Sequence, residues 1–261
     1  MMATHRFHPL VLAFMFLLLS TPIVRATVIK PVTLDELTDR AELIFEGVVT
    51  HIDYRMSEQD TLDQPILPYT FVTFSIDRIL KGSSLDGDTI TLRFEGGPAD
   101  DGKLLFIPGM PLFDLGDHDI VFARDNGSAI SPIVGWGQGR FRIVRGELFS
   151  DEGVELHATA AGSLVRGHRR EMEEVSKNWI GNMVFETVAG GEDAPDPGLR
   201  IAPERGPVPP RLSVEGFENL ISGKVRAGHG RGAAAVRSAD VRARIVVPAE
   251  RPAAPPDRPD R

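Results

Sequence analysis

The sequence predicts a mainly β protein: an antiparallel, partly closed barrel of five to seven strands, with a short leading helix and a C-terminal helix. Short segments of alternating apolar and polar residues are separated by Gly, Pro and Asp, which is typical of strands and turns. Strand and helix patterns do not alternate, so a parallel sheet is not expected. One short antiparallel sheet would leave its edges exposed, and closure into a barrel removes them.

The first 26 residues have the order of a secretory signal. Met1–Pro9 carries Arg6 and no acidic residue, Leu10–Leu19 is an unbroken apolar run, and Val24-Arg25-Ala26 fits a signal-peptidase site. A membrane-spanning helix needs roughly 20 apolar residues, so a short membrane anchor fits this run less well. We therefore expect cleavage after Ala26, export to the periplasm or the extracellular space, and no transmembrane segment in the mature chain.

A short helix opens the predicted barrel domain. Thr33-Leu34-Asp35-Glu36 is a capping box, in which a hydroxyl residue is followed three positions later by Glu. Leu34, Leu37 and Ala41 recur on one helical face, which predicts a helix of about two turns.

Seven segments then predict strands. The first is apolar on both faces, and the second alternates most clearly, with Val72, Phe74 and Ile76 between polar residues. A long Gly- and Pro-rich connection occupies Gly96–Gly116, and a short Gly-rich connection occupies Gly135–Gly139. The predicted strands are Leu43–Ile52, Tyr69–Leu80, Thr89–Phe94, His118–Arg124, Ile130–Val134, Arg140–Val144 and Leu148–Phe149.

The C-terminal third has weaker patterns. Ser213 as N-cap, with Leu212 and Phe217 at the two staple positions, predicts a helix that packs back on the barrel. Residues 169–179 also have helical composition. From Lys224 onward the chain is Ala, Arg, Pro and Gly without an aromatic residue, which predicts disorder. The predicted parts are a signal peptide at 1–26, the barrel at 27–150, an extension with a linker and one helix at 151–223, and a disordered tail at 224–261.

Composition excludes several classes of function. The protein has no cysteine, so disulfides, thiolate metal sites and Cys nucleophiles are excluded. Its net charge is −8, which becomes −10 once Arg6 and Arg25 leave with the signal. Residues 27–223 carry −15 and the tail carries +5. We expect no nucleic-acid partner for so acidic a body, because phosphate contacts need Lys and Arg.

Several segments between residues 32 and 144 resemble a known family. They are Ala41–Val49, Phe71–Gly82, Gly87–Leu92, Leu115–Phe122 and the Val-Gly-x-x-Gln-Gly-x-Phe segment Val134–Phe141. Their order resembles the OB-fold barrel of netrin-like and tissue-inhibitor-of-metalloproteinase-like domains. It resembles more closely a group of exported bacterial proteins of unknown function. The resemblance implies an OB-like barrel outside the cytoplasm. The inhibitors act through an N-terminal Cys that this chain lacks, so their mechanism does not carry over, and fold alone does not give function.

The densest group of metal-capable side chains consists of Asp114, Asp117, His118 and Asp119. Carboxylates and imidazole are suitable donors for Ca²⁺ or a transition metal. The run lacks the fixed spacing of a Ca²⁺ loop, so a Gly-Asp turn leading into a strand is the simpler interpretation. We predict no cofactor, with a divalent metal as the one possibility.

The candidate binding residues are Trp136, Gln138 and Phe113, on the two Gly-rich connections. We expect an exported, non-catalytic module that presents these loops to a partner protein or a small ligand. Two alternatives stay open. One is a metal-dependent hydrolase that uses the four metal-capable residues, and the other is a cell-envelope structural protein whose basic tail binds an acidic polymer. The sequence makes no prediction of the oligomeric state.

Overall fold

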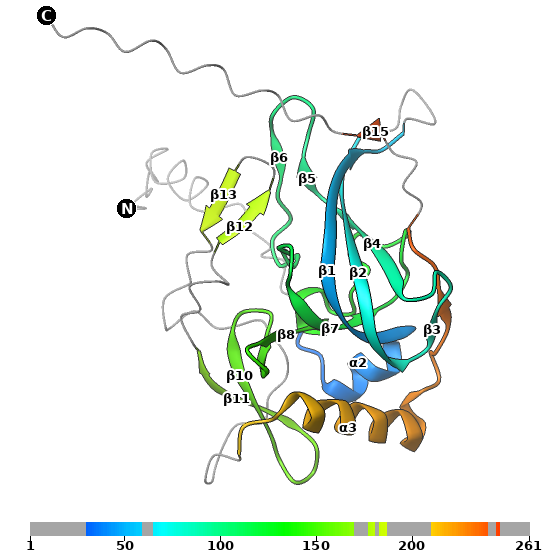
Figure 1. Ribbon diagram of the computed structural model, residues 1–261, viewed down its shortest axis with the longest axis vertical. Coiled ribbons are helices and arrows are strands. Elements are labelled where there is room, and N and C mark those ends of the chain that lie inside the picture. Colours follow the sequence, from blue (N-terminus) through cyan, green and yellow to red (C-terminus); the bar gives the residue numbers. More distant parts are fainter. Residues whose placement is uncertain are drawn as a thin grey trace, which may run out of the picture.

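The structure, a computed structural model, describes residues 30–58, 65–169, 177–180, 183–186, 210–239 and 244–245. The predicted signal peptide and nearly all of the predicted linker lie outside the described residues. The protein is mainly β, with a short leading helix and a longer C-terminal helix (Figure 1). No helix among the described residues combines the length and apolar character that crossing a membrane requires.

The main helices are α2 (Leu34–Arg40) and α3 (Val214–Lys224), with the short helices η1 (Trp136–Gly139) and η2 (Val225–His229). The strands are β1 (Leu43–Met56), β2 (Pro68–Lys81), β3 (Ser83–Ser84), β4 (Thr89–Glu95), β5 (Gly97–Pro98), β6 (Leu104–Leu105), β7 (His118–Ala123), β8 (Arg140–Val144), β9 (Glu147–Ser150), β10 (Val154–Ala158), β11 (Leu164–Arg169), β12 (Lys177–Ile180), β13 (Met183–Glu186), β14 (Ala235–Val236) and β15 (Arg244–Ile245).

The leading helix forms as its sequence predicts. The Thr33 hydroxyl accepts a hydrogen bond from the Glu36 backbone N–H, and the Glu36 carboxylate accepts one from the Thr33 N–H at 2.8 Å, which completes the capping box. Leu34 and Leu37 are buried on one face of α2. The predicted capping box and the predicted apolar face of this helix are both confirmed.

Eight antiparallel strands form one large sheet in the order β11-β10-β9-β8-β7-β1-β2-β4, and β15 pairs with the far end of β1. Strand β1 is long and bulged, and it pairs with β2 along most of its length and with β7 over its first half. Bulges bend a strand and increase its twist. Figure 1 shows β1 and β2 as long curved ribbons. Within the described residues the sheet has two ends, β11 and β4, and is not closed into a barrel.

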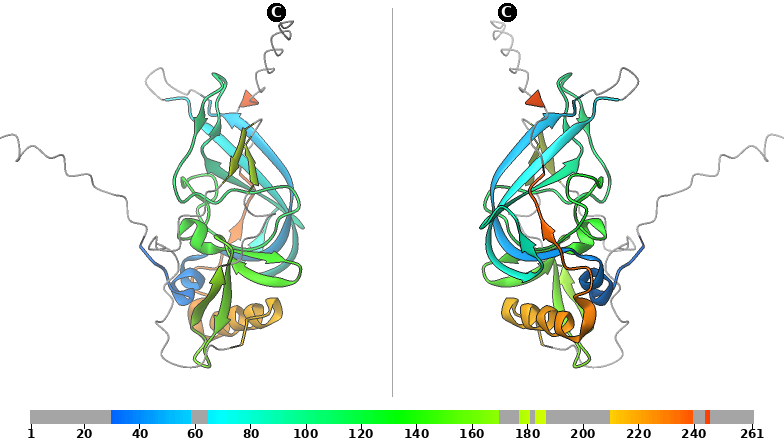
Figure 2. Two further views of the ribbon diagram at one scale, coloured as in Figure 1. Left: turned by 90° about the vertical axis from the view of Figure 1, so that its left-hand side faces the viewer. Right: turned by 90° about the vertical axis from the view of Figure 1, so that its right-hand side faces the viewer.

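Two apolar cores lie on opposite faces of this sheet. Neighbouring residues of β7 alternate between them, with Phe122 in one core and Val121 in the other. Helices α2 and α3 cover the first core, where Phe217 of α3 packs 4.6 Å from Phe141, centroid to centroid. Figure 2 shows α3 at the end of the molecule opposite the β5 and β6 strands. The prediction that β1 is buried on both faces is confirmed for its first half.

The sheet continues past the predicted domain boundary at residue 150. Strands β9 and β10 pair with each other, and Leu148, Leu156 and Leu164 are buried in the core that α3 covers. The added strands bring the sheet above the predicted five to seven. They are hard to detect in the sequence because polar residues such as Glu155 are also buried there.

Three local predictions fail. Ile130–Val134 forms no strand, and only Ile133 bridges to Ala123, since Pro132 lacks the N–H that a strand needs. The predicted helix at 169–179 is contradicted at both ends, where β11 finishes and β12 begins. The disordered tail predicted from Lys224 is ordered over 224–239.

That part of the tail is ordered because it pairs with exposed strand edges. Strand β14 runs parallel to β3, and Val236 is buried. The Ala239 N–H donates to the Thr91 carbonyl of β4 at 2.9 Å, and the Thr91 N–H donates to the Ser238 hydroxyl at 2.8 Å. An edge strand with free backbone groups offers such partners, and the composition of the tail does not show them.

Candidate functional site

A fully buried arginine gathers three carboxylates beside β7 and β8. Arg140 donates from Nε to Asp119 Oδ2 at 3.0 Å, from Nη2 to Asp117 Oδ2 at 2.6 Å and from Nη1 to Asp151 Oδ1 at 3.1 Å. Its Nη1 also donates to the carbonyl of Leu112. Such a guanidinium, saturated with acceptors, fixes the loops that carry these acids on the sheet.

Burial changes the titration of these acids. It raises the pKa of Asp151 to about 6, against the opposing effect of Arg140, and the charge of Glu152 adds to the rise. Arg142 opposes the rise, and Asp119 contributes to it. Burial likewise raises the pKa of Asp119, whose Oδ1 has no hydrogen-bond partner. The cluster is therefore a structural ion-pair network that carries a desolvation cost.

The four residues predicted as one metal site do not converge on a single ion. Asp117 and Asp119 face Arg140, while His118 lies between them in sequence and projects from the other face of the strand. Both oxygens of Asp117 are occupied, because Oδ1 accepts from Arg142 at 2.9 Å and Oδ2 also accepts from the Asp114 N–H at 2.9 Å. The strand's two-residue period thus separates the predicted cluster.

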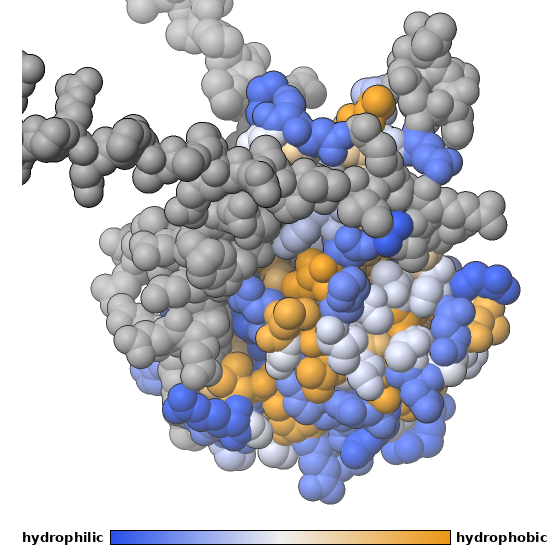
Figure 3. All heavy atoms as spheres, turned by 45° about the horizontal axis from the view of Figure 1, so that its top comes forward, coloured by the Kyte–Doolittle hydropathy of each residue, from blue (hydrophilic) through white to orange (hydrophobic). Residues whose placement is uncertain are grey.

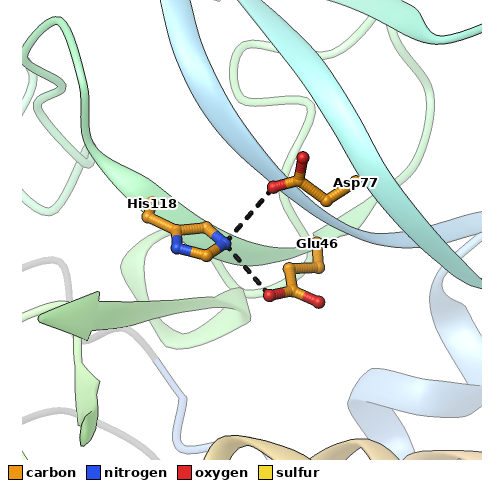
Figure 4. A group of neighbouring side chains, drawn as sticks. All are labelled: Glu46, Asp77 and His118. Carbon is orange, nitrogen blue, oxygen red and sulfur yellow. Dashed lines mark ion pairs between the residues drawn. The ribbon is translucent and has the colours of Figure 1, made fainter. Parts of the chain in front are cut away.

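On that other face, His118 meets two acids that the sequence analysis does not single out. Its Nε2 lies 3.0 Å from Glu46 Oε1 and 3.4 Å from Asp77 Oδ2 (Figure 4). The three residues come from the adjacent strands β7, β1 and β2. Glu46 is buried, the His118 side chain is 33 % exposed and that of Asp77 is 49 % exposed. Each side chain can offer one ligand atom to a cation that enters from solvent.

A further acid lies behind this group. Glu218 of α3 is 5 % exposed, and its carboxyl group lies against that of Glu46. Arg78 donates to Oε2 of Glu218, while Oε1 is buried without a donor. Burial raises the pKa of Glu218 to about 7, and the nearby charge of Glu46 adds to the rise. Three carboxyl groups, those of Glu46, Asp77 and Glu218, are therefore gathered where β1 and β2 meet α3.

The predicted binding residues have largely structural surroundings. Gln138 is buried, and its side chain accepts from the Val32 N–H at 2.8 Å and donates to the Lys30 carbonyl at 3.2 Å. It thereby ties the leading segment to η1. Phe113 is buried among aromatic rings, and the Arg140 guanidinium lies 4.1 Å from its centroid. Gln138 is thus held by internal hydrogen bonds and Phe113 by ring packing, whereas Trp136 is half-buried at a left-handed backbone position.

The long Gly- and Pro-rich connection does form a pocket, and of the predicted binding residues Phe113 belongs to its lining. The pocket lies between the far ends of β1, β2 and β4 and the chain from β5 to Phe113. Phe106 stands at this loop with half of its surface exposed. The space-filling view toward this end of the molecule shows apolar side chains exposed beside polar ones (Figure 3). The lining is mainly apolar and includes Ile52, Tyr54, Phe94, Leu105, Phe106, Ile107 and Met110.

Comparison with known proteins adds no assignment. No protein-family model matches the chain, and no curated protein is significantly similar to it in sequence. The class that fold and sites define is accordingly a mainly β protein with an open antiparallel sheet, an apolar loop pocket and a His–carboxylate group.

The sequence contains only weak signals for the group formed by Glu46, Asp77 and His118. Glu46 is an acid inside the apolar first half of β1, and a buried position for such a residue is unusual. Asp77 and His118 look like ordinary outward-facing strand residues. Their meeting depends on the pairing of β1 with both β2 and β7, which joins positions far apart in the chain.

Proposed function

We propose that this protein is an exported, non-catalytic interaction module that receives an apolar side chain of a partner protein in the loop pocket. The observation that carries the proposal is the pocket itself. It has an apolar lining, and Phe106 is half exposed at its loop. Large apolar side chains that are exposed beside a hollow are typical of binding surfaces.

The size of the pocket favours a protein partner over a small-molecule ligand. Its cavity volume is about 40 Å³. An engineered cavity that binds benzene has roughly 150 Å³, and drug-sized ligands need several hundred. Since about 10–15 Å³ holds one water molecule, this hollow takes the tip of one aliphatic side chain, with the surrounding loop making the remaining contacts.

Export is supported by the N-terminal pattern of a charged start, an apolar run and a small-residue cleavage site. We also propose that β1, β2, β4, β7 and β8 correspond to an OB-like barrel. The support is their antiparallel arrangement and the bulged first strand, which pairs on both sides. An OB-fold is a five-stranded, partly open barrel, and its loops commonly bind ligands.

The binding proposal is tested with a displayed peptide library selected on the mature chain. We expect selected peptides to share one apolar anchor. Phe106→Ser should weaken their binding about 10-fold or more, as expected for the loss of a central apolar contact. Leu85→Ser removes an equally exposed apolar side chain outside the pocket and should leave the affinity unchanged. Peptides without an apolar anchor, or equal binding by Phe106→Ser, would contradict the proposal.

Export is tested by expressing the full chain in a bacterium and measuring the mass of the protein in each fraction. The expected product begins at Thr27 and is found outside the cytoplasm. An uncleaved cytoplasmic chain would contradict the export part of the proposal and leave the pocket test unaffected.

A further inference from the structure

We propose that Glu46, Asp77 and His118 bind one divalent transition-metal ion of the Zn²⁺ class on the face of the sheet beneath α3. This site goes beyond the proposed interaction function. None of its residues lines the apolar pocket, so either proposal can fail without the other.

The separations between the ligand atoms fit a small tetrahedral ion. Zn²⁺ binds His nitrogen and carboxylate oxygen at about 2.0–2.2 Å, so two ligands at a tetrahedral angle lie about 3.3 Å apart. The observed separations from His118 Nε2 are 3.0 Å to Glu46 Oε1 and 3.4 Å to Asp77 Oδ2. All three ligand atoms lie within 4.8 Å of one another. The three atoms therefore surround a position that an ion can occupy with small side-chain adjustments.

The backbone holds these ligands in place. Glu46 and His118 project from the paired strands β1 and β7, whose register places Val48 opposite His118 and Glu46 opposite Ile120. Asp77 comes from β2 on the other side of β1 (Figure 4). Ligands on paired strands are positioned more firmly than ligands on loops, so little ordering cost is left for the metal to overcome.

A second observation points to a missing cation. Glu218 is 5 % exposed, its carboxyl group lies against Glu46, and its Oε1 has no hydrogen-bond donor. His118 Nε2 is also buried without a well-formed hydrogen bond. Buried acids are normally paired or bound to metal, and the ion-pair partners of Glu46 and Glu218 among the described residues are His118 and Arg78 alone. A dication would bind Glu46 directly and favour the charged form of Glu218 behind it.

The donor set and the access route define the class of ion. One imidazole and two carboxylates suit Zn²⁺ and neighbouring first-row divalent ions better than Ca²⁺, which prefers six to eight oxygens. The half-exposed Asp77 side chain lies on the solvent side, and it gives the ion an entry route and leaves a coordination position for water. Glu218, as an outer carboxylate behind Glu46, would add to the negative charge that attracts the ion.

The test is calorimetric titration of Zn²⁺ into the full mature chain after dialysis against a chelator. We expect one Zn²⁺ per chain, with the affinity of His118→Ala and of Asp77→Asn reduced roughly 100-fold or more. Glu218→Gln should lose about 10- to 100-fold, which is typical for an outer partner of a ligand. Each variant is checked for folding by circular dichroism, and Asp77→Asn, at a half-exposed position, serves if His118→Ala does not fold.

His229 provides a matched control within the same chain. It also lies beside two acids, but through different nitrogens, with Nδ1 2.9 Å from Asp39 and Nε2 3.9 Å from Asp35. No single nitrogen faces both acids, so His229→Ala should bind Zn²⁺ like the parent chain. The proposal is overturned if the parent chain binds no Zn²⁺, if His118→Ala and Asp77→Asn retain the affinity, or if His229→Ala loses it equally.

Discussion

Replacement of the buried arginine tests what holds the loops of this protein on its sheet. Arg140→Met keeps much of the side-chain volume and removes the guanidinium. Asp119 is fully buried, so after the substitution it must either stay ionised without a partner or take up a proton. Asp117 and Asp151 lose a partner as well, and the Leu112 carbonyl loses its donor.

The size of the effect follows from these contacts. Removing one partner of a buried ion pair costs about 3–5 kcal/mol, because an uncompensated charge stays behind. An unsatisfied buried carbonyl adds about 1–3 kcal/mol. We therefore expect Arg140→Met to lose about 4 kcal/mol or more, a large part of the roughly 5–15 kcal/mol by which a typical domain is stable.

Urea unfolding followed by far-UV circular dichroism measures this loss. Lys103→Ala serves as the control, because it removes a cation from an exposed ion pair with Asp101 and should leave the unfolding midpoint unchanged. The double variant Asp119→Leu/Arg140→Met replaces the pair with apolar groups and should be more stable than Arg140→Met alone. A loss below about 1 kcal/mol in Arg140→Met, the scale of an exposed pair, would refute the reasoning.

Three further predictions use the same unfolding assay. Burial raises the pKa of Asp151 to about 6, above its unfolded value, so the stability that this carboxyl contributes should fall as pH rises from about 4 to 6, and the parent chain should lose more stability over this range than Asp151→Asn; equal slopes would contradict the assignment. Phe217→Ala should cost about 3–5 kcal/mol, because its ring is fully buried, and a loss near zero would mean that α3 does not support the core. Gly82→Ala should cost more than Gly87→Ala. Both have positive φ, which costs about 1–2 kcal/mol, but only at Gly82 would the new Cβ lie 2.2 Å from the Glu42 carbonyl oxygen; equal costs would exclude that clash.

Local chemistry made several elements predictable. The capping box at Thr33 and the apolar stripe of α2 require only residues within one helical turn of one another. The same holds for Ser213, whose hydroxyl accepts from the Gly216 N–H at 3.0 Å at the start of α3. The alternation in β2 and β4 likewise follows from the two-residue period of a half-buried strand.

The candidate site was predictable only in part. Asp117, His118 and Asp119 are consecutive in the chain and therefore suggest a cluster. Side chains alternate along a strand, however, so His118 lies on the face of the sheet opposite to Asp117 and Asp119. The sequence analysis did not identify Arg140 as the partner of these acids. Arg140 is 21 positions from Asp119 and is fully buried. A buried arginine is rare, and nothing in its local sequence indicates burial.

The amino-acid sequence alone determined the helix caps, most strands of the main sheet, the cysteine-free chemistry and the acidic charge of the body, because each depends on residues close together in the chain or on a count. The tertiary structure decided which side chains meet: Arg140 with three acids, His118 with Glu46 and Asp77, and the ordered part of the tail with β3 and β4. These contacts depend on strand register and on free sheet edges, which are set by packing between segments far apart in the chain.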